Sequence, residues 1–288
     1  MPELPEVETV VRQLARVLPG LGIADVEVLH ADLLREPAQS FRKGLQDVRI
    51  RTVERRGKNI LLFLSSDSVL VVNLGMTGQL LFFPHNRTAE APSTPAGDSA
   101  GVSYPTHPAI SFSLHPDGTL LYADTRRFGS LRRLGWREWE VESARLGPEP
   151  LAPEMTPSVL FDGLSGSRSP VRSWLLDQRK VAGIGNIYAV EALFRAGIHP
   201  RRPANSLDGV DAHRLLEAIQ AVLREAIRAR GTTLRDYRTA EGGTGGFGPS
   251  LLAYGRENEP CPRCNAPIRR IVFGNRSAFL CPNCQPSE

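Results

Sequence analysis

The chain has 288 residues, of which 41% are hydrophobic and 23% are charged, and its formal net charge is +4 at pH 7. That is the composition of an ordinary globular protein, long enough for two domains with cores of their own. No apolar run reaches the roughly 18 residues that a membrane-spanning helix needs, and no signal-peptide pattern precedes the first predicted helix, so we expect no membrane partner and a cytoplasmic protein.

The basic charge is concentrated in the second half of the chain. Residues 150–288 carry 18 basic and 13 acidic side chains, whereas residues 1–149 carry 17 and 18. Between Pro260 and Pro286 there are four arginines and no acidic residue. This distribution indicates a polyanionic partner, although basic surfaces are often merely solvated.

The first ten residues, MPELPEVETV, place a predicted helix directly behind the N-terminus. Apolar residues recur there at helical spacing: Val7, Val10, Val11, Leu14 and Leu18. Pro5 suits the first helical turn, so Pro2 and Glu3 lie just before a helix N-terminus, where the dipole is positive. If Met1 is removed, Pro2 becomes a free secondary amine; the alternative is an ordinary capped and frayed terminus.

The next part of the chain predicts strands. Short apolar or alternating runs, split by Gly, Asp, Ser and Pro, cover residues 59–64, 69–74, 79–83, 109–114 and 119–124. Their spacing favours an antiparallel β-sandwich or barrel-like sheet, and we expect the first domain to span residues 1–134. Residues 84–108, rich in Ala, Pro, Ser and Gly, cannot bury much apolar area, which predicts a disordered insertion.

Lysine is rare in this sequence. Of the 35 basic residues only Lys43, Lys58 and Lys180 are lysines. In a sequence that uses arginine for almost all of its basic residues, a lysine is expected where the bulky, forked guanidinium cannot replace the ammonium group. Lys58, in the run RRGKNILL, is therefore a candidate functional residue.

Two predicted turns carry side chains that are unusual for turns. Met76 lies in the Gly-flanked run NLGMTGQL, and Arg126 and Phe128 lie in DTRRFGSLRRL. An exposed Met, Arg and Phe together could form a wedge that enters a base stack. Taken singly, each is more often a core residue or a solvated charge.

From about residue 135 the pattern becomes helical. A Pro-rich connector is followed by helical spacing in residues 171–178, 186–197 and 211–230, and we expect a linker and helical domain over 135–238. In the run KVAGIGNIYAVEALF, Asn186 opens a helix whose free amides can receive a phosphate. A Gly-x-Gly turn alone is weak evidence, so a DNA-binding role stays open at this point. Residues 239–254 read as a mobile Gly-rich loop and a connection.

The last predicted domain, residues 255–288, is a small cysteine module. Its ligand candidates are all the cysteines of the chain, in two C-x2-C pairs: Cys261, Cys264, Cys281 and Cys284. Four thiolates at this spacing predict one closed, tetrahedral, structural zinc site, and two disulfides are the alternative. Between the pairs we expect a two-stranded hairpin that turns at Gly274-Asn275 and places Arg276 at its tip, where it suits phosphate contact.

The motifs together identify a family. PELPEVET, GMTG, DTRRFG, LGPEPL, GIGNIYAVEALFRAGIHP, GTTLRDY and the finger YGRENEPCPRCNAPI…NRSAFLCPNC resemble bacterial formamidopyrimidine-DNA glycosylase of the Fpg/Nei family. The resemblance covers nearly the whole chain in the family's order, and only residues 84–108 look extra. It implies an α+β fold of two domains: an N-terminal antiparallel β-sandwich with flanking helices, and a helix–two-turn–helix domain with a zinc-finger β-hairpin.

The resemblance also implies a role for the N-terminal residues. Pro2 would be the nucleophile that forms a Schiff base, and Glu3 the proton donor beside it. Lys58 would donate a proton in the elimination steps and contact DNA. The wedge that fills the space of the flipped base would comprise Met76, Arg126 and Phe128.

In the second half, the resemblance implies phosphate contacts. Asn186 and Arg276 would bind phosphates, and Arg276 would also donate a proton in δ-elimination. We expect two further DNA contacts, Arg168 and Arg172. The Gly-rich residues 239–250 would close over the everted base.

The implied activity is that of a bifunctional glycosylase and AP lyase. It would remove oxidised purines from duplex DNA by β,δ-elimination, with one structural zinc ion and DNA carrying oxidised bases or abasic sites as its partner. We expect a monomer, associated with the nucleoid. The alternatives are an endonuclease VIII-like glycosylase for oxidised pyrimidines and a non-catalytic zinc protein that binds damaged DNA. PELPEVE and LGMTG favour the purine enzyme, and the intact Pro2, Glu3 and Lys58 favour catalysis.

Overall fold

The computed structural model describes residues 2–84, 104–273 and 275–287. Most of the predicted insertion (85–103) and Gly274 of the predicted hairpin turn therefore lie outside the described residues. The chain forms two compact units, residues 1–143 with 229–246, and residues 144–228 with 247–288. Among the described residues, no helix is both long and apolar enough to cross a membrane.

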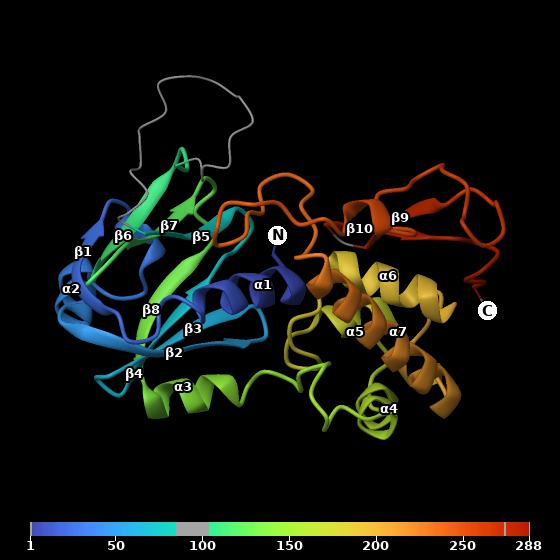
Figure 1. Cartoon of the computed structure of the whole chain (residues 1–288). Helices are drawn as coiled ribbons and strands as arrows, with labels where there is room; N and C mark the ends of the chain where they lie inside the picture. Colours follow the sequence, from blue (N-terminus) through green and yellow to red (C-terminus); the bar gives the residue numbers. More distant parts are fainter. Residues whose placement is uncertain (1, 85–103, 274, 288) are drawn as a thin grey trace, which may run out of the picture. The chain divides into compact units, whose positions relative to one another are not determined.

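The first unit is built on one antiparallel sheet with the strand order β5-β7-β6-β1-β2-β3-β4-β8 (Figure 1). The strands are β1 (Gly22–Val28), β2 (Val48–Arg56), β3 (Asn59–Leu64), β4 (Ser68–Asn73), β5 (Gly78–Phe83), β6 (Pro108–His115), β7 (Thr119–Asp124) and β8 (Ser130–Gly135). The helices are α1 (Leu4–Leu14), α2 (Ala38–Leu45) and α3 (Trp136–Ser143), with a 3-10 turn at Ala31–Leu33. The predicted strands 59–64 and 119–124 are confirmed to the residue.

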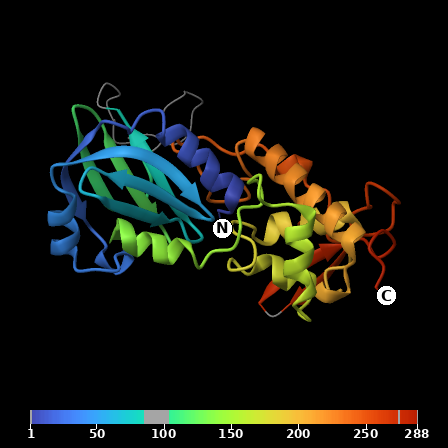
Figure 2. The same cartoon turned by 90° about the horizontal axis from the view of Figure 1, so that it is seen from below.

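This sheet bends into a sandwich. Strands β1 and β2 share only two paired positions, Gly22 with Arg49 and Ile23 with Val48, so two four-stranded halves meet there. Residues from both halves, including Leu62, Leu80 and Phe112, form one buried cluster. Helix α1 packs against β2 and β3 (Figure 2). The predicted antiparallel β-sandwich with flanking helices is therefore confirmed.

The second unit is mainly helical. Its elements are α4 (Pro157–Ser165), α5 (Val171–Leu176), α6 (Asn186–Ala196), α7 (Gly209–Arg228), the hairpin β9 (Arg269–Phe273) and β10 (Arg276–Leu280), and 3-10 turns at Ala204–Ser206 and Gly248–Ser250. Helix α6 contacts α5, α7 and β10. The carboxylate of Glu191 on α6 is fully buried and accepts backbone N–H bonds from Leu252, Ala253 and Tyr254. It thereby holds the connection that leads into the finger.

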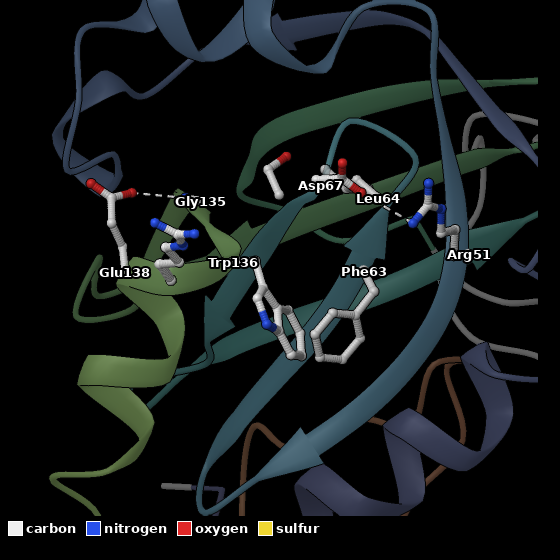
Figure 3. Close-up of a pocket in the computed structure, with 9 residues that line it drawn as sticks. Arg51, Phe63, Leu64, Asp67, Gly135, Trp136 and Glu138 are labelled. Atoms are coloured by element: carbon white, nitrogen blue, oxygen red, sulfur yellow. Dashed lines mark hydrogen bonds and ion pairs between the residues drawn. The ribbon is translucent and has the colours of Figure 1, made fainter.

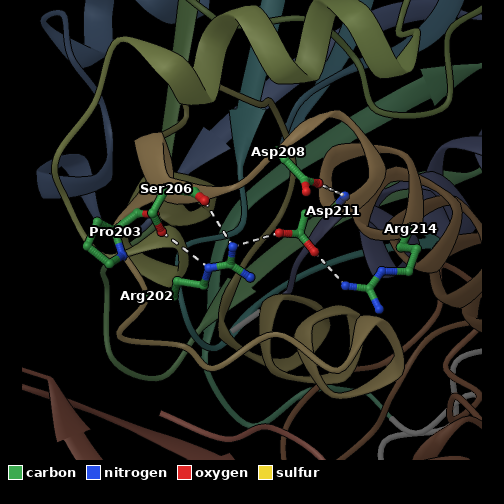
Figure 4. Close-up of polar contacts among 6 residues, drawn as sticks. All are labelled: Arg202, Pro203, Ser206, Asp208, Asp211 and Arg214. Atoms are coloured by element: carbon green, nitrogen blue, oxygen red, sulfur yellow. Dashed lines mark hydrogen bonds and ion pairs between the residues drawn. The ribbon is translucent and has the colours of Figure 1, made fainter. Parts of the chain in front are cut away.

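Charged side chains fix the start of α7. Asp208 accepts a hydrogen bond of 2.8 Å from the backbone N–H of Asp211, as an N-capping residue does. Asp211 forms ion pairs with Arg214 and, at 2.8 Å, with Arg202, which also binds the Ser206 carbonyl (Figure 4). The Asp211 side chain is 8% exposed. These charges stabilise the loop before α7.

Candidate active site and nucleic-acid interface

Pro2 and Glu3 lie at the N-terminus of α1. Both are buried, and Glu3 is 2% exposed. Glu3 is the N-cap residue: its carboxylate accepts the Glu6 N–H, and the Glu6 carboxylate accepts the Glu3 N–H at 2.7 Å, which completes a capping box. The first residues are therefore held in one conformation at the positive end of the helix dipole, which disfavours a positive charge there.

The Glu6 carboxylate also binds a distant part of the chain. Its second oxygen accepts the N–H of Thr232 at 2.7 Å, and the Tyr237 hydroxyl donates to the Glu6 carbonyl at 3.3 Å. Further along α1, Gln13 accepts the N–H of Ala240 at 2.8 Å. These bonds anchor residues 229–246 on α1. Residues 239–246 of the predicted capping loop thus belong to the first unit, and 247–254 to the second.

Lys58 lies in the tight turn between β2 and β3. It follows Gly57, which has a φ of +58°, and its side chain is half-buried. The next residue, Asn59, accepts a side-chain hydrogen bond of 2.9 Å from Asn73, and Asn73 accepts the N–H of Gly75 at 3.0 Å. This chain of bonds places the Lys58 turn and the Gly75–Gly78 turn at the same end of the sheet.

The three predicted wedge residues lie on two turns that touch. Met76 is 37% exposed and Phe128 is 58% exposed, so both are available to a partner. The Arg126 guanidinium lies 4.6 Å from the centre of the Phe128 ring. Gly75 has a φ of +56°, and a Cβ there would lie 2.5 Å from the Gly129 backbone nitrogen, so only glycine allows the turns to approach this closely. The fold brings Met76, Arg126 and Phe128 together.

In the second unit, Asn186 links three elements. It opens α6, its side-chain amide donates to the Ser277 carbonyl of β10 at 2.9 Å, and its oxygen accepts a bond of 2.6 Å from Arg172. Arg172, predicted to contact DNA, is only 1% exposed. Burial and the charge of neighbouring Arg276 lower its pKa. Its place in the structure is that of a support for Asn186, and a direct DNA contact stays a prediction.

The finger hairpin presents a basic surface. Arg276 is exposed at the start of β10, and Arg168 is exposed in the loop before α5. Two guanidinium groups lie near the Phe273 ring: that of the buried Arg172 is 4.9 Å and that of Arg201 is 5.4 Å from the ring centre. The exposed Arg168, Arg201 and Arg276 suit a polyanionic partner.

The four cysteines fit a zinc ion. They are free, and their Sγ atoms all lie within 4.8 Å of one another. The Sγ atoms of Cys261 and Cys284 are 3.9 Å apart, and those of Cys264 and Cys281 are 3.4 Å apart. Zinc–sulfur bonds of about 2.3 Å in a tetrahedron separate the sulfurs by about 3.8 Å, whereas a disulfide needs about 2.05 Å. Four thiolates close the site, so this zinc would be structural.

A cavity of about 710 Å³ lies elsewhere, beside β3 and α3. Figure 3 shows residues that line it: Phe63 and Trp136, whose rings lie 5.3 Å apart, and Arg51, which forms an ion pair with Asp67. None of the predicted site residues lines this cavity.

Several supporting residues were not predicted from the sequence, chiefly Glu6 and Asp124. Glu6 lies in the helical run, where its spacing three residues after Glu3 is a capping-box signal. Asp124 ends a strand, and no pattern in the sequence around it indicates its hydrogen bonds with Thr77 and Gly129.

The comparisons with known proteins agree with this geometry. Three family models match: the formamidopyrimidine-DNA glycosylase N-terminal domain over residues 1–131, its H2TH domain over 146–238, and the zinc finger found in FPG and IleRS over 258–286. The third match and the sulfur geometry together establish one structural zinc ion.

Individual relatives are similar over their full length. The formamidopyrimidine-DNA glycosylase of Thermomicrobium roseum is 42% identical over 99% of both chains, and that of Moorella thermoacetica is 44% identical over 94% of both. Among solved structures, the MutM (FPG) protein of Thermus thermophilus matches with a TM-score of 0.85 and 37% identity over 100% of both chains. Lactococcus lactis Fpg in complex with abasic-site DNA has a TM-score of 0.85, at 30% identity over 99% of this chain and 100% of that one. The chain belongs to the formamidopyrimidine-DNA glycosylase family.

Proposed function

We propose that this protein is a bifunctional DNA glycosylase and AP lyase of base excision repair. It removes oxidised purines, such as 8-oxoguanine and formamidopyrimidines, from duplex DNA. The observation that carries the proposal is the N-terminus: Pro2 and Glu3 are present and buried at the start of α1, in a chain that matches glycosylases over its whole length.

The chemistry starts at Pro2, once Met1 has been removed. A free α-amine has a pKa of roughly 7.7–8, and the positive end of the α1 dipole favours its neutral, nucleophilic form. The nitrogen attacks C1′ of the sugar, the glycosidic bond breaks and the base leaves. Glu3, held by the capping box, donates a proton to the ring oxygen as the sugar opens.

The covalent intermediate then drives strand cleavage. Loss of the amine proton and opening of the sugar give an iminium ion between Pro2 and C1′. This electron sink makes the neighbouring carbon acidic, so the 3′ phosphate and then the 5′ phosphate leave by elimination. Lys58 and Arg276 are the proposed proton donors for these two departures.

The remaining site residues bind and open the duplex. A base inside the stack cannot be reached, so it must be everted. Met76, Arg126 and Phe128 would occupy the vacated space, and residues 239–250 would close over the base. Asn186 and Arg276 would bind phosphates, Arg168 would add a contact, and Arg172 would hold Asn186.

The test is an excision assay with matched duplexes that carry either 8-oxoguanine or an oxidised pyrimidine. A solved Lactococcus lactis Fpg complex contains DNA with an oxidised pyrimidine, so binding alone does not separate the two activities. We expect faster single-turnover release of 8-oxoguanine opposite cytosine. Faster release of the pyrimidine would assign the endonuclease VIII-like activity, and tight binding without release would assign a non-catalytic protein.

We also propose that the enzyme acts as a cytoplasmic monomer associated with the nucleoid, because its substrate is the chromosome. The described residues show no membrane-spanning helix. Light scattering of the free protein at micromolar concentration tests the monomer, and a dimer mass would reject it.

A further inference from the structure

Asp124, at the end of β7, is a buried carboxylate between the two turns that carry the proposed wedge. It is 3% exposed. One oxygen accepts the Thr77 hydroxyl at 2.5 Å and the Arg126 N–H at 3.3 Å. The other accepts the Gly129 N–H at 2.8 Å and the Tyr122 hydroxyl at 3.3 Å. One side chain therefore gathers donors from both turns.

The donors lie next to the exposed wedge residues. Thr77 directly follows Met76, and Gly129 directly follows Phe128. The Thr77 hydroxyl also accepts the Arg126 N–H at 3.0 Å, so the two turns are bonded to each other as well as to Asp124. A shift of the carboxylate would therefore move the backbone beneath Met76 and beneath Phe128 at once.

The hydrogen bonds around Asp124 restrict the movement of the two turns. A buried carboxylate without donors is costly, so its oxygens keep the hydrogen bonds that satisfy them. The two turns are already in close contact: there is no room for a Cβ at Gly75, where it would meet Gly129, or at Gly129, where it would meet the Tyr122 hydroxyl. Burial and the charge of Asp124 raise the pKa of Tyr122, so its hydroxyl stays a donor.

We infer that Asp124 is a positioning residue that holds the two wedge turns in register and so sets the rate of base eversion. This inference rests on the proposed function, because the wedge has a role only on DNA. Asp124 does not touch the reacting atoms, and the chemistry at Pro2 should not depend on it.

The test uses Asp124→Asn in the full-length, zinc-loaded protein. An amide has one acceptor atom, so one pair of donors loses its partner while the side-chain volume is kept. Eversion is followed by stopped-flow fluorescence of 2-aminopurine placed beside 8-oxoguanine in a duplex. Lyase activity on a single-stranded abasic oligonucleotide, which needs no eversion, is measured in parallel. The matched control is Asp67→Asn, in the exposed β3–β4 turn.

We expect Asp124→Asn to slow the eversion signal and duplex excision by about 10- to 100-fold, the loss that a misplacement of about 1 Å causes. Single-stranded lyase activity should stay at the wild-type level, as should all activities of Asp67→Asn. Wild-type eversion rates in Asp124→Asn, or equal losses of eversion and lyase activity, would overturn the inference. If the wild-type protein everts the base but does not excise it, the proposed function itself is wrong.

A second pair of variants covers the case in which Asp124→Asn does not fold. Thr77→Val removes the hydroxyl that bridges Asp124 and Arg126 at nearly constant volume, and Thr77→Ser retains it. We expect slower eversion in Thr77→Val and wild-type eversion in Thr77→Ser. Equal eversion rates in these two variants would overturn the inference independently.

Discussion

At the scale of single residues, two glycines allow the cost of a strained backbone to be measured apart from the cost of steric crowding. Gly20 and Gly75 both have positive φ, +91° and +56°, but a Cβ at Gly20 would meet nothing within 4 Å, whereas one at Gly75 would meet Phe128 and Gly129. Gly20→Ala should cost about 1–2 kcal/mol of stability, the cost of a left-handed backbone. Gly75→Ala should cost more and also slow excision. Thermal melting and single-turnover excision measure both, and equal losses in stability would contradict the crowding.

A substitution at Glu3 should affect base excision without affecting DNA affinity. Glu3→Gln keeps the shape of the capping box, because the amide oxygen can still accept the Glu6 N–H. It removes the acidic proton, so base excision should fall by about 100-fold or more, while affinity for lesion DNA stays near the wild-type value. Excision and fluorescence anisotropy measured on the same duplex check this. A variant that binds poorly but releases bound substrate at the normal rate would contradict the role.

Arg276 tests the phosphate contact. Arg276→Ala should weaken affinity by a similar factor for all sequences, and the slope of log affinity against log salt should decrease by about 1. Arg137→Ala, an exposed arginine on α3, is the control and should leave the slope unchanged. Titrations at several salt concentrations give the slope. An unchanged slope in Arg276→Ala would exclude the contact.

At the scale of elements, the pair of Glu8 and Arg55 joins α1 to β2 at 2.8 Å. Burial raises the pKa of Glu8, but hydrogen bonds and charges from Arg55 and Arg12 outweigh it and lower the pKa below the ordinary 4.5. A carboxyl group whose pKa is lower in the folded state stabilises the fold at pH values above its unfolded-state pKa. This contribution is lost as pH falls through its folded-state pKa.

Glu8→Gln should therefore lower the free energy of unfolding by about 2 kcal/mol at neutral pH, and the deficit should shrink below pH 4.5. Denaturant melts between neutral and acidic pH measure it. Glu140→Gln, at an exposed position of α3, is the control and should show no such pH dependence. A deficit that stays constant with pH would mean that the ion pair does not link the two elements.

The zinc finger is the second element-scale test. Its core is small, with Ile268, Ala278 and Cys281 buried beside Phe194 of α6, so the hairpin depends on its metal. Chelation should unfold residues 255–288, lower DNA affinity and leave the melting of the first unit unchanged. Hydrogen exchange and anisotropy, with re-added zinc as the control, follow both effects. Wild-type DNA affinity in the zinc-free protein would contradict a role of the finger in DNA binding.

At the scale of the whole molecule, the sequence predicted what is local and periodic. Strands 59–64 and 119–124 are apolar runs, and α7 has a regular buried face, so their patterns are strong. Strand β2 was not predicted, because charged residues alternate along Val48–Arg56 and a bulge between Ile50 and Thr52 breaks the alternation. The fold class is confirmed, and the roles of the site residues stay predictions.

What the sequence could not reveal depends on contacts between distant residues. Thr77 and Asp124 are 47 positions apart, and Glu6 and Thr232 are 226 apart. Neither pair leaves a local pattern, because any acidic residue could accept either bond. Residues 229–246 therefore read as part of the helical half and its loop, although Thr232, Tyr237 and Ala240 form hydrogen bonds with α1.

The proposed function depends on Pro2 becoming the N-terminal nucleophile. The most direct measurement treats the protein and an 8-oxoguanine–cytosine duplex with borohydride, which reduces the iminium ion, and then identifies the crosslinked peptide by mass spectrometry. We expect a DNA adduct on the peptide that begins at Pro2, with Met1 absent, and no adduct on the N-terminal peptide of Pro2→Gly. An adduct on a lysine instead, or no adduct while 8-oxoguanine is still released, would contradict it.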